Sequence, residues 1–243
     1  MFGKLMARLR TRGATAETTL ETGEADVGGV FGGRIEIKGG SRPQTIRSVV
    51  VQLKARALVE ISGEKVPGEI IVAEAAFEAG EIEADGEAWI EFEMEVPDHA
   101  PITAGSTQLV VETYLKIGGV LEHAHTCDIH VHPSPAMAAI LNGVIAAGFD
   151  LAEAEVEHRP GSPVQFLQEF DFVPSSHGDW GIEEVEIALA PMEGATEVHL
   201  TVDSRGGLFF GGTERTARFI LRDEELEGVD MGMAIRQAID SLA

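Results

Sequence analysis

The chain is poor in cysteine and in basic residues, and both shortages exclude certain classes of protein. Cys127 is the single cysteine in 243 residues, so an intrachain disulfide is impossible and a secreted, disulfide-built scaffold is excluded. Lysine and arginine together number 18 against 41 aspartates and glutamates, which gives a formal net charge of −23. A chain this acidic repels phosphate backbones, so we expect no nucleic-acid binding.

Long hydrophobic runs are also missing. The longest nearly uncharged stretch, 131–149, contains two prolines and falls short of the roughly 20 apolar residues that span a bilayer. Near the N-terminus, Lys4 and Arg8 interrupt the apolar residues between Phe2 and Leu9, so this segment lacks the apolar core of a signal peptide. The sequence therefore predicts a cytoplasmic protein.

What the sequence does contain is a period-two alternation of apolar and polar residues, which predicts antiparallel strands. In 107–117, Leu109, Val111 and Thr113 share one face, while Glu112 and Tyr114 take the other. Strand-like segments recur, separated by turn residues about every ten positions, at 34–38, 46–60, 69–78, 87–96, 121–132, 151–157, 164–173, 182–190, 197–203 and 216–222. This spacing is typical of β-sandwiches.

A proline-bounded helix separates the two halves of the chain. Ser134 is a favourable N-cap, Pro135 suits the first helical position, and Gly148 can end the helix. The helix carries no charged residue, so we expect it to be buried between two sheets or against a second subunit. A last helix places Met231 and Ile235 on the same face as Ile239 and Leu242. We therefore predict domains at 1–133, with a short amphipathic helix at its start, and at 134–243.

Several segments carry a family resemblance through their order and spacing, although none is diagnostic alone. They are 31–40, 46–47, 51–53, 96–97, 101–105, 117–119, 132–133, 166–174, 184–187 and 202–203. Together these segments, which extend from about residue 15 to residue 222, resemble the sporulation-control family "Spo-zero-M", whose members are bacterial proteins.

The resemblance implies a mainly β fold with two arrestin-like antiparallel β-sandwich domains, the linking helix and the C-terminal helix. It also implies a non-catalytic adaptor that acts through protein–protein interactions in sporulation-type, cell-cycle or stress control. It brings no catalytic residue and no cofactor. Two alternatives stay open: a metal-dependent enzyme that uses the histidines at 123–132, and a self-assembling structural scaffold. Besides other proteins, a second copy of the chain is a candidate partner, which would make the protein a homo-oligomer.

Histidines are concentrated in one predicted strand. His123, His125 and Cys127 are expected on one face, whereas His130 and His132 point the other way. Ligands at i and i+2 on one face can meet a transition metal, but the division between two faces argues against a single site. We therefore favour solvated or core-edge histidines and predict no metal site. Similarly, Ser175 to Asp179 is better explained as a turn than as a hydrolase triad.

Residues 1–12 hold the clearest basic cluster. Lys4, Arg8, Arg10 and Arg12 are the only charged residues in the first sixteen positions. The side chains that we expect to contact a partner or an anionic membrane surface are Phe2, Lys4, Leu5, Arg8 and Leu9. Each basic residue near such a membrane contributes about 1 kcal/mol, so binding would be weak and peripheral. The glycine-rich loop at 205–212 carries three apolar residues, but its role does not follow from the sequence.

Overall fold

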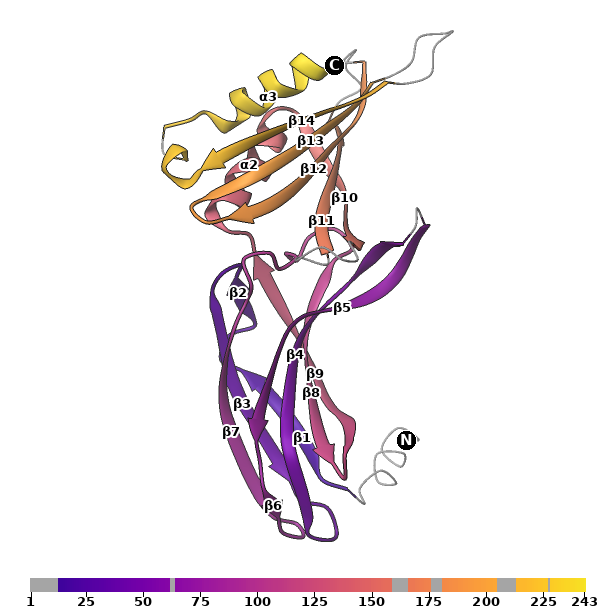
Figure 1. Ribbon diagram of the computed structural model, residues 1–243, viewed down its shortest axis with the longest axis vertical. Helices are drawn as coiled ribbons and strands as arrows, with labels where there is room; N and C mark the ends of the chain where they lie inside the picture. Colours follow the sequence, from indigo (N-terminus) through magenta and orange to yellow (C-terminus); the bar gives the residue numbers. More distant parts are fainter. Residues whose placement is uncertain (1–12, 62–63, 159–165, 176–180, 205–212, 227) are drawn as a thin grey trace. The chain divides into compact units, whose positions relative to one another are not determined.

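The computed structural model describes residues 13–61, 64–158, 166–175, 181–204, 213–226 and 228–243 (Figure 1). These residues form two compact units. The first contains the described residues within 1–56, 69–97 and 108–131, and the second contains those within 57–68, 98–107 and 132–243. The chain passes between the two units several times, and its last segment in the second unit begins at His132, one residue before the predicted division at Pro133. Two segments assigned from the sequence to the first domain, 57–68 and 98–107, group with the second unit instead.

The first unit contains two antiparallel sheets. One sheet has the order β1-β3-β7, with β1 at Thr15–Leu20, β3 at Val30–Lys38 and β7 at Glu87–Glu95. The other runs β4-β8-β9-β2, with β4 at Gln44–Ile61, β8 at Gln108–Ile117, β9 at Val120–His132 and β2 at Glu24–Asp26. Strands β5 (Glu64–Glu78) and β6 (Glu81–Ile82) also pair with β4.

The alternation in the sequence explains how these two sheets pack. Residues at every second position of β4 and β8 are fully buried, among them Val49, Val51, Leu53 and Val111. In the facing sheet, Ile35 on β3 is also fully buried, and Phe92 and Met94 on β7 have exposed fractions of 4% and 6%. Burial of one face of each sheet is the packing of a β-sandwich. The alternation predicts these buried positions of the first unit; it also places Ala88, near the start of β7, on the inward face, but Ala88 is exposed.

The second unit is built on five antiparallel strands in the order β14-β13-β12-β11-β10. Their bounds are Phe149–His158 for β10, Phe166–Pro174 for β11, Ile182–Met192 for β12, Ala195–Ser204 for β13 and Thr213–Arg222 for β14. The end of β4 pairs in parallel with β10 at Val59 and Val156. A 3-10 turn at Asp223–Glu225 follows β14.

Two helices, α2 (Pro135–Ala146) and α3 (Met231–Leu242), pack against each other and against this sheet (Figure 1). The predicted caps of α2 are present: Ser134 Oγ accepts a hydrogen bond from the Met137 amide at 3.3 Å, and Gly148 adopts φ +98°. Ile140 and Val144 of α2 and Ile239 of α3 are completely buried. The predicted mainly β fold with a linking helix and a C-terminal helix is confirmed, and a helix pair here takes the position that a second sheet has in the first unit.

Small residues allow the two helices to approach closely. A Cβ atom added at Gly143 would lie 2.7 Å from Met231 Cγ and 3.1 Å from the Met231 carbonyl oxygen. A Cβ atom at Gly232 would lie 2.9 Å from Ala146 Cβ.

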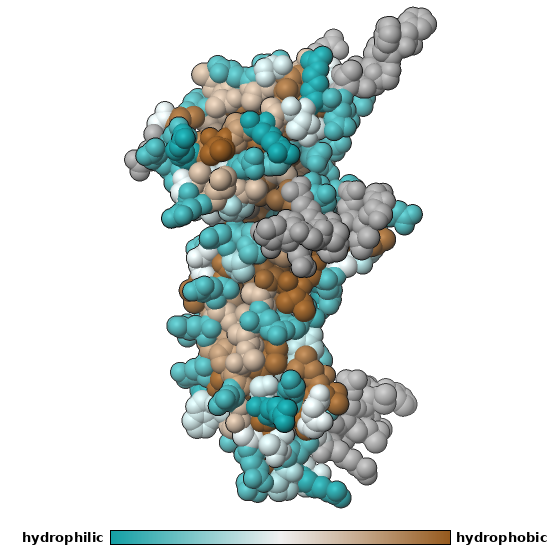
Figure 2. Space-filling model, in the orientation of Figure 1, coloured by the Kyte–Doolittle hydropathy of each residue, from teal (hydrophilic) through white to brown (hydrophobic). Residues whose placement is uncertain are grey.

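Among the described helices, neither is long and apolar enough to cross a membrane. On the visible surface, hydrophilic and hydrophobic residues are interspersed (Figure 2).

Candidate functional site: an acidic face of the second unit

The sheet of the second unit (β10 to β14) has one face with buried apolar side chains, and carboxylates line its other face. Cross-strand pairing places Glu153 opposite Asp171, and Asp171 opposite Glu186. Next to this row, Glu184 is opposite Asp203, and Asp203 is opposite Glu214. Directly opposed residues of antiparallel strands point to the same side of the sheet. Together with Glu155, we call this set the acidic face: Glu153, Glu155, Asp171, Glu184, Glu186, Asp203 and Glu214.

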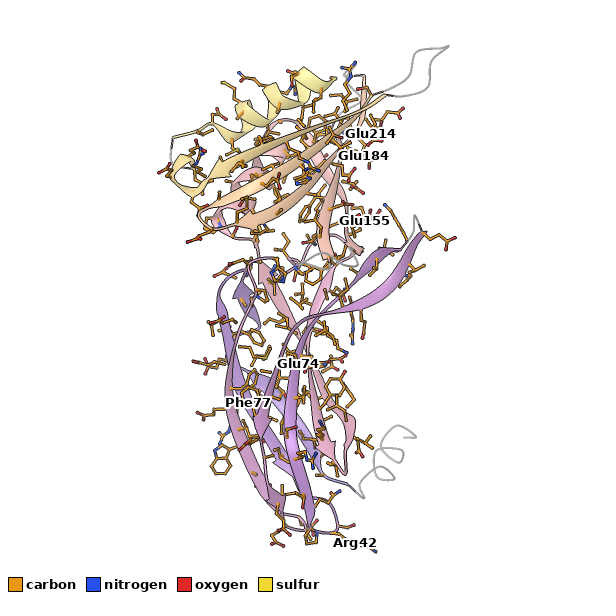
Figure 3. The ribbon with its side chains drawn as sticks, in the orientation of Figure 1. Arg42, Glu74, Phe77, Glu155, Glu184 and Glu214 are labelled. Carbon is orange, nitrogen blue, oxygen red and sulfur yellow. The ribbon has the colours of Figure 1, made fainter. Side chains whose placement is uncertain are left out.

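Figure 3 labels Glu155, Glu184 and Glu214, which come from three different strands of the sheet. Two β-bulges help to assemble the face. In β10 the register shifts between Leu151 and Glu153, and in β12 it shifts between Ile182 and Glu184. Each bulge inserts one extra residue and so turns the following side chain to the other side of the sheet. Ile182 is therefore buried in the core while Glu184, two positions later, belongs to the acidic face.

A lysine from β5 forms ion pairs with this face. Lys65, at the beginning of β5, places its Nζ atom 2.8 Å from Glu155 Oε1. The same atom lies 3.9 Å from Glu153 Oε2 and 3.9 Å from Asp171 Oδ2. The hydrogen bond to Glu155 raises the pKa of Lys65, with burial opposing it. Lys65 therefore stays charged, but a single positive charge serves three carboxylates.

The charges of the acidic face influence one another. Burial, reinforced by the negative charges of Glu184 and Glu155, raises the pKa of Asp171 to about 6 although Lys65 opposes the shift. Burial and the carboxylates of Asp171 and Glu184 likewise raise the pKa of Glu186. Desolvation and like-charge repulsion both disfavour an ionised carboxyl group. The acidic face is thus under electrostatic stress that positive charge from outside would relieve.

Glu155 is the most buried carboxylate of the acidic face, with 4% of its surface exposed. Its Oε1 atom accepts the hydrogen bond from Lys65, whereas its Oε2 atom is buried without a hydrogen-bond partner. Such an unsatisfied oxygen is uncommon in native proteins because it loses water without compensation. It marks a position at which a ligand could donate a hydrogen bond.

The histidine-rich strand gives a different result from the one expected. The register of β8 and β9 shifts at Thr113 and Tyr114, so that Thr113 is opposite His125 but Tyr114 is opposite His123. The predicted sharing of one face by His123, His125 and Cys127 is therefore wrong, because a β-bulge at position 124 turns His123 to the other side. Instead, His123 Nε2 lies 2.8 Å from Thr126 Oγ1, and the His123 and Tyr114 rings pack in a T-shaped arrangement with their centroids 5.4 Å apart.

The remaining members of the cluster have structural partners. The Thr18 amide donates to His125 Nδ1 at 3.2 Å, and the Cys127 thiol donates to the Val111 carbonyl oxygen at 3.8 Å. Burial, with the nearby charge of Asp128, raises the pKa of Cys127 to about 11, so the thiol is protonated at neutral pH. The backbone amide of His130 donates to the Gly23 carbonyl oxygen. Among the described residues, no three His, Cys, Asp or Glu side chains are grouped to hold a metal ion.

A second charged cluster lies in the first unit and is internally paired. Glu112 is 5% exposed and accepts hydrogen bonds from Lys54 Nζ at 2.7 Å, Arg56 Nη2 at 2.8 Å and the Tyr114 hydroxyl. Burial alone would raise the pKa of Glu112, but the hydrogen bonds from Lys54 and Tyr114 outweigh it and lower the pKa. Because Glu69 also pairs with Arg56 at 2.8 Å, this cluster is balanced, in contrast to the acidic face.

Three sequence-based predictions concern residues outside the described part of the structure. The proposed contact residues Phe2, Lys4, Leu5, Arg8 and Leu9 lie there, as do the 205–212 loop and most of the Ser175–Asp179 segment. The acidic face, by contrast, was missed by the sequence analysis. Its signal was the repeated acidic residue at alternate positions of 153–157, 169–171 and 184–186, but only the register of the strands brings these positions together.

The described residues thus define a predominantly β protein of two units, the second of which carries an acidic sheet face. The chain matches the family model described as SpoOM protein over residues 2–206, and it therefore belongs to the Spo0M family. This confirms the family resemblance found in the sequence.

A relative and a solved structure agree with this assignment. The sporulation-control protein Spo0M of Bacillus subtilis (strain 168) is 28% identical over 213 residues, which cover 84% of this chain and 81% of the relative. The crystal structure of Spo0M from Bacillus subtilis matches with a TM-score of 0.82 and 26% identity, covering 95% of this chain and 99% of the other. The similarity therefore extends over most of the chain.

Proposed function

We propose that this protein is a non-catalytic regulator that acts by binding other proteins in the cytoplasm, in sporulation-type, cell-cycle or stress control. Membership of a sporulation-control family supports the regulatory role. The observation that carries the binding role is the acidic face, where four directly opposed acidic pairs span the sheet. Like charges in such pairs destabilise a sheet. A protein that retains such pairs is less stable than it could be, and this loss of stability in favour of function is common at binding sites.

The alternative of a metal-dependent enzyme at the histidine cluster finds little support in the geometry. The bulge in β9 separates His123 from His125, and the Cys127 thiol is held protonated by burial. A metal ligand would need the thiolate form of this cysteine. The histidines instead complete hydrogen bonds and ring contacts at the edge of the sandwich.

Reciprocal affinity capture in the native host tests the proposal. The tagged full-length chain is crosslinked in living cells, and each captured protein is then tagged and used to recover the chain. We expect a reproducible partner, and we expect a His123→Gln/Cys127→Ser variant to recover it equally well and to complement a deletion strain. Failure of reciprocal capture would contradict a binding role. Loss of complementation by the variant, with stoichiometric metal in the purified protein, would favour the enzyme.

For residues 1–12 we propose a salt-sensitive contact with a partner or an anionic membrane, based on Lys4, Arg8 and the apolar side chains between them. Four basic residues at about 1 kcal/mol each give only weak attachment. Co-sedimentation with anionic vesicles at low and high salt, with and without residues 1–12, tests the membrane contact. Equal sedimentation of both versions would contradict it.

A further inference from the structure

The acidic face differs from an ordinary solvated surface in how its charges are arranged. The carboxylates of Glu153, Asp171 and Glu186 form one cross-strand row, and those of Glu184, Asp203 and Glu214 form the next. Exposed acidic residues on β7 of the first unit are less constrained, because their strand lies opposite Arg34 and Lys38 of β3. The two acidic rows have no basic residue directly opposite them in the strand register of the described residues; Lys65 approaches them from β5, and Arg218 lies on the same side of β14 in a neighbouring row, opposite His199.

Glu155 supplies an independent indication that this face takes a ligand. Its Oε2 atom is buried and accepts no hydrogen bond, although its Oε1 atom is bound by Lys65. A buried carboxylate oxygen without a donor is costly, and a charged donor is the partner that satisfies it best. The missing donor must come from a group that can enter beside the Lys65 side chain, which is itself 44% exposed.

We propose that the acidic face binds a segment of a partner protein rich in lysine or arginine, with one cationic side chain donating to Glu155 Oε2 beside Lys65. This inference rests on the proposed binding function and specifies the chemistry of the partner. The remaining cations of the segment lie along the two rows of carboxylates and add positive charge to that of Lys65.

The size of the face favours a chain segment over a single ion. Its carboxylates come from five adjacent strands, and at about 4.8 Å per strand they extend over about 19 Å. One metal ion coordinates oxygens at about 2.0–2.6 Å and would neutralise only one end of such a row. An extended peptide advances about 3.3 Å per residue, so roughly six residues cover the distance.

Charge also favours a different protein over a second copy of this chain. A second copy carries the same formal net charge of −23, so its approach is opposed by long-range repulsion. A basic partner is instead attracted over about a Debye length, which speeds its association at low salt. Nucleic acids and phosphate-rich surfaces are repelled for the same reason as a second copy.

Fluorescence anisotropy with a defined peptide tests the proposal on the full-length chain. The probe is a labelled peptide of about nine residues that alternates arginine and serine, so that it spans the roughly six residues required. Its control is the same peptide with glutamine in place of arginine. We expect the arginine peptide to bind at about 50 mM salt and to be released at about 500 mM, because exposed ion pairs are screened. We expect the glutamine peptide not to bind.

Matched variants separate a local site from the effect of net charge. Glu184→Gln/Glu214→Gln removes two carboxylates from the acidic face, and Glu91→Gln/Glu93→Gln removes two exposed carboxylates from β7 in the first unit. Both variants have the same net charge. We expect about tenfold weaker binding from the first and less than about twofold from the second. Equal weakening by both would overturn the proposal, because only net charge would then matter.

Lys65→Gln provides a test with the opposite sign. Removing this competing cation leaves Glu153, Glu155 and Asp171 without their counter-charge, so the arginine peptide should bind several-fold tighter. A merely structural role of Lys65 would predict weaker binding, and that result would count against the proposal. Glu155→Gln should weaken binding, provided that circular dichroism shows an intact fold.

Two further outcomes would assign the face to another occupant. If equimolar Mg²⁺ or Ca²⁺ displaces the peptide, the face is a metal site and the proposal is wrong. If a peptide of residues 1–12 binds more tightly than the arginine–serine peptide and deletion of that segment abolishes self-association, the occupant is a second copy. Failure of the inference remains distinct from failure of the proposed function. Undiminished reciprocal capture by Glu184→Gln/Glu214→Gln would refute the acidic face as the site and leave the binding role intact.

Discussion

The balanced cluster around Glu112 allows a sharp prediction about stability. Glu112→Gln keeps the size of the side chain but removes the negative charge that Lys54 and Arg56 share. Lys54 is only 12% exposed, so its charge would be left in a largely desolvated place, where Glu69 Oε2 at 3.5 Å remains as its carboxylate partner. Breaking one partner of a buried ion pair costs about 3–5 kcal/mol. Because Arg56 is 41% exposed and keeps Glu69, we expect the lower end, about 3 kcal/mol.

Urea unfolding at pH 7, followed by circular dichroism, measures this loss as a lower midpoint at unchanged slope. The control is Glu93→Gln, which removes the same charge from an exposed position and should change the free energy of unfolding by less than about 0.5 kcal/mol. The double variant Lys54→Met/Glu112→Leu should be less destabilised than Glu112→Gln, because both charges are removed together. A loss below about 1 kcal/mol for Glu112→Gln would refute the reasoning.

Three further predictions concern the second unit. Ile140→Ala should lower the free energy of unfolding, measured in urea, by about 3 kcal/mol because Ile140 is fully buried. Ile145→Ala, at a half-exposed position of the same helix, should change it by less than about 0.5 kcal/mol. Equal effects would show that α2 is not packed as described. Gly105→Ala should destabilise by about 1–3 kcal/mol in the same assay, since its φ is +52° and a Cβ would lie 2.7 Å from the Ala154 amide nitrogen. Asp171→Asn should stabilise the protein by about 1 kcal/mol at pH 8 and by nothing near pH 4, compared by thermal unfolding across that range; a benefit that grows toward acid pH would contradict it.

The sign of the Asp171 effect follows from the direction of its pKa shift. The folded-state pKa of about 6 lies above the ordinary value of 3.8, so the folded protein binds more protons than the unfolded chain between these values. Protonated Asp171 therefore contributes fully to the free energy of unfolding below about pH 4, and this contribution is lost as the pH rises through 6. The groups that face Asp171 are Glu153 and Glu155 of β10, Lys65 of β5, Glu184 and Glu186 of β12, Asp203 of β13 and Glu214 of β14.

Local chemistry made much of the fold predictable from the sequence. Ser134 and Gly148 bound α2 as expected, because a cap side chain and a positive-φ glycine act within one turn. Alternation also identified the buried face of β4 and β8, since burial follows the period of two. The grouping of 57–68 and 98–107 with the second unit did not follow from the sequence. It depends on contacts such as the hydrogen bonds between Gln168 and the Ile102 backbone, which join residues far apart in the chain.

The candidate sites were predicted less well because β-bulges, which alternation cannot reveal, decide which side chains meet. The bulge in β9 sends His123 away from His125 and so divides a cluster that the sequence placed together. The bulges in β10 and β12 do the reverse, because they bring Glu153 and Glu184 into register with Asp171 and Asp203. One extra residue reverses the side-chain parity of everything that follows it in the strand. The same feature that removes the apparent metal site therefore assembles the acidic face, and a period-two pattern predicts the core more reliably than it predicts a surface that depends on register.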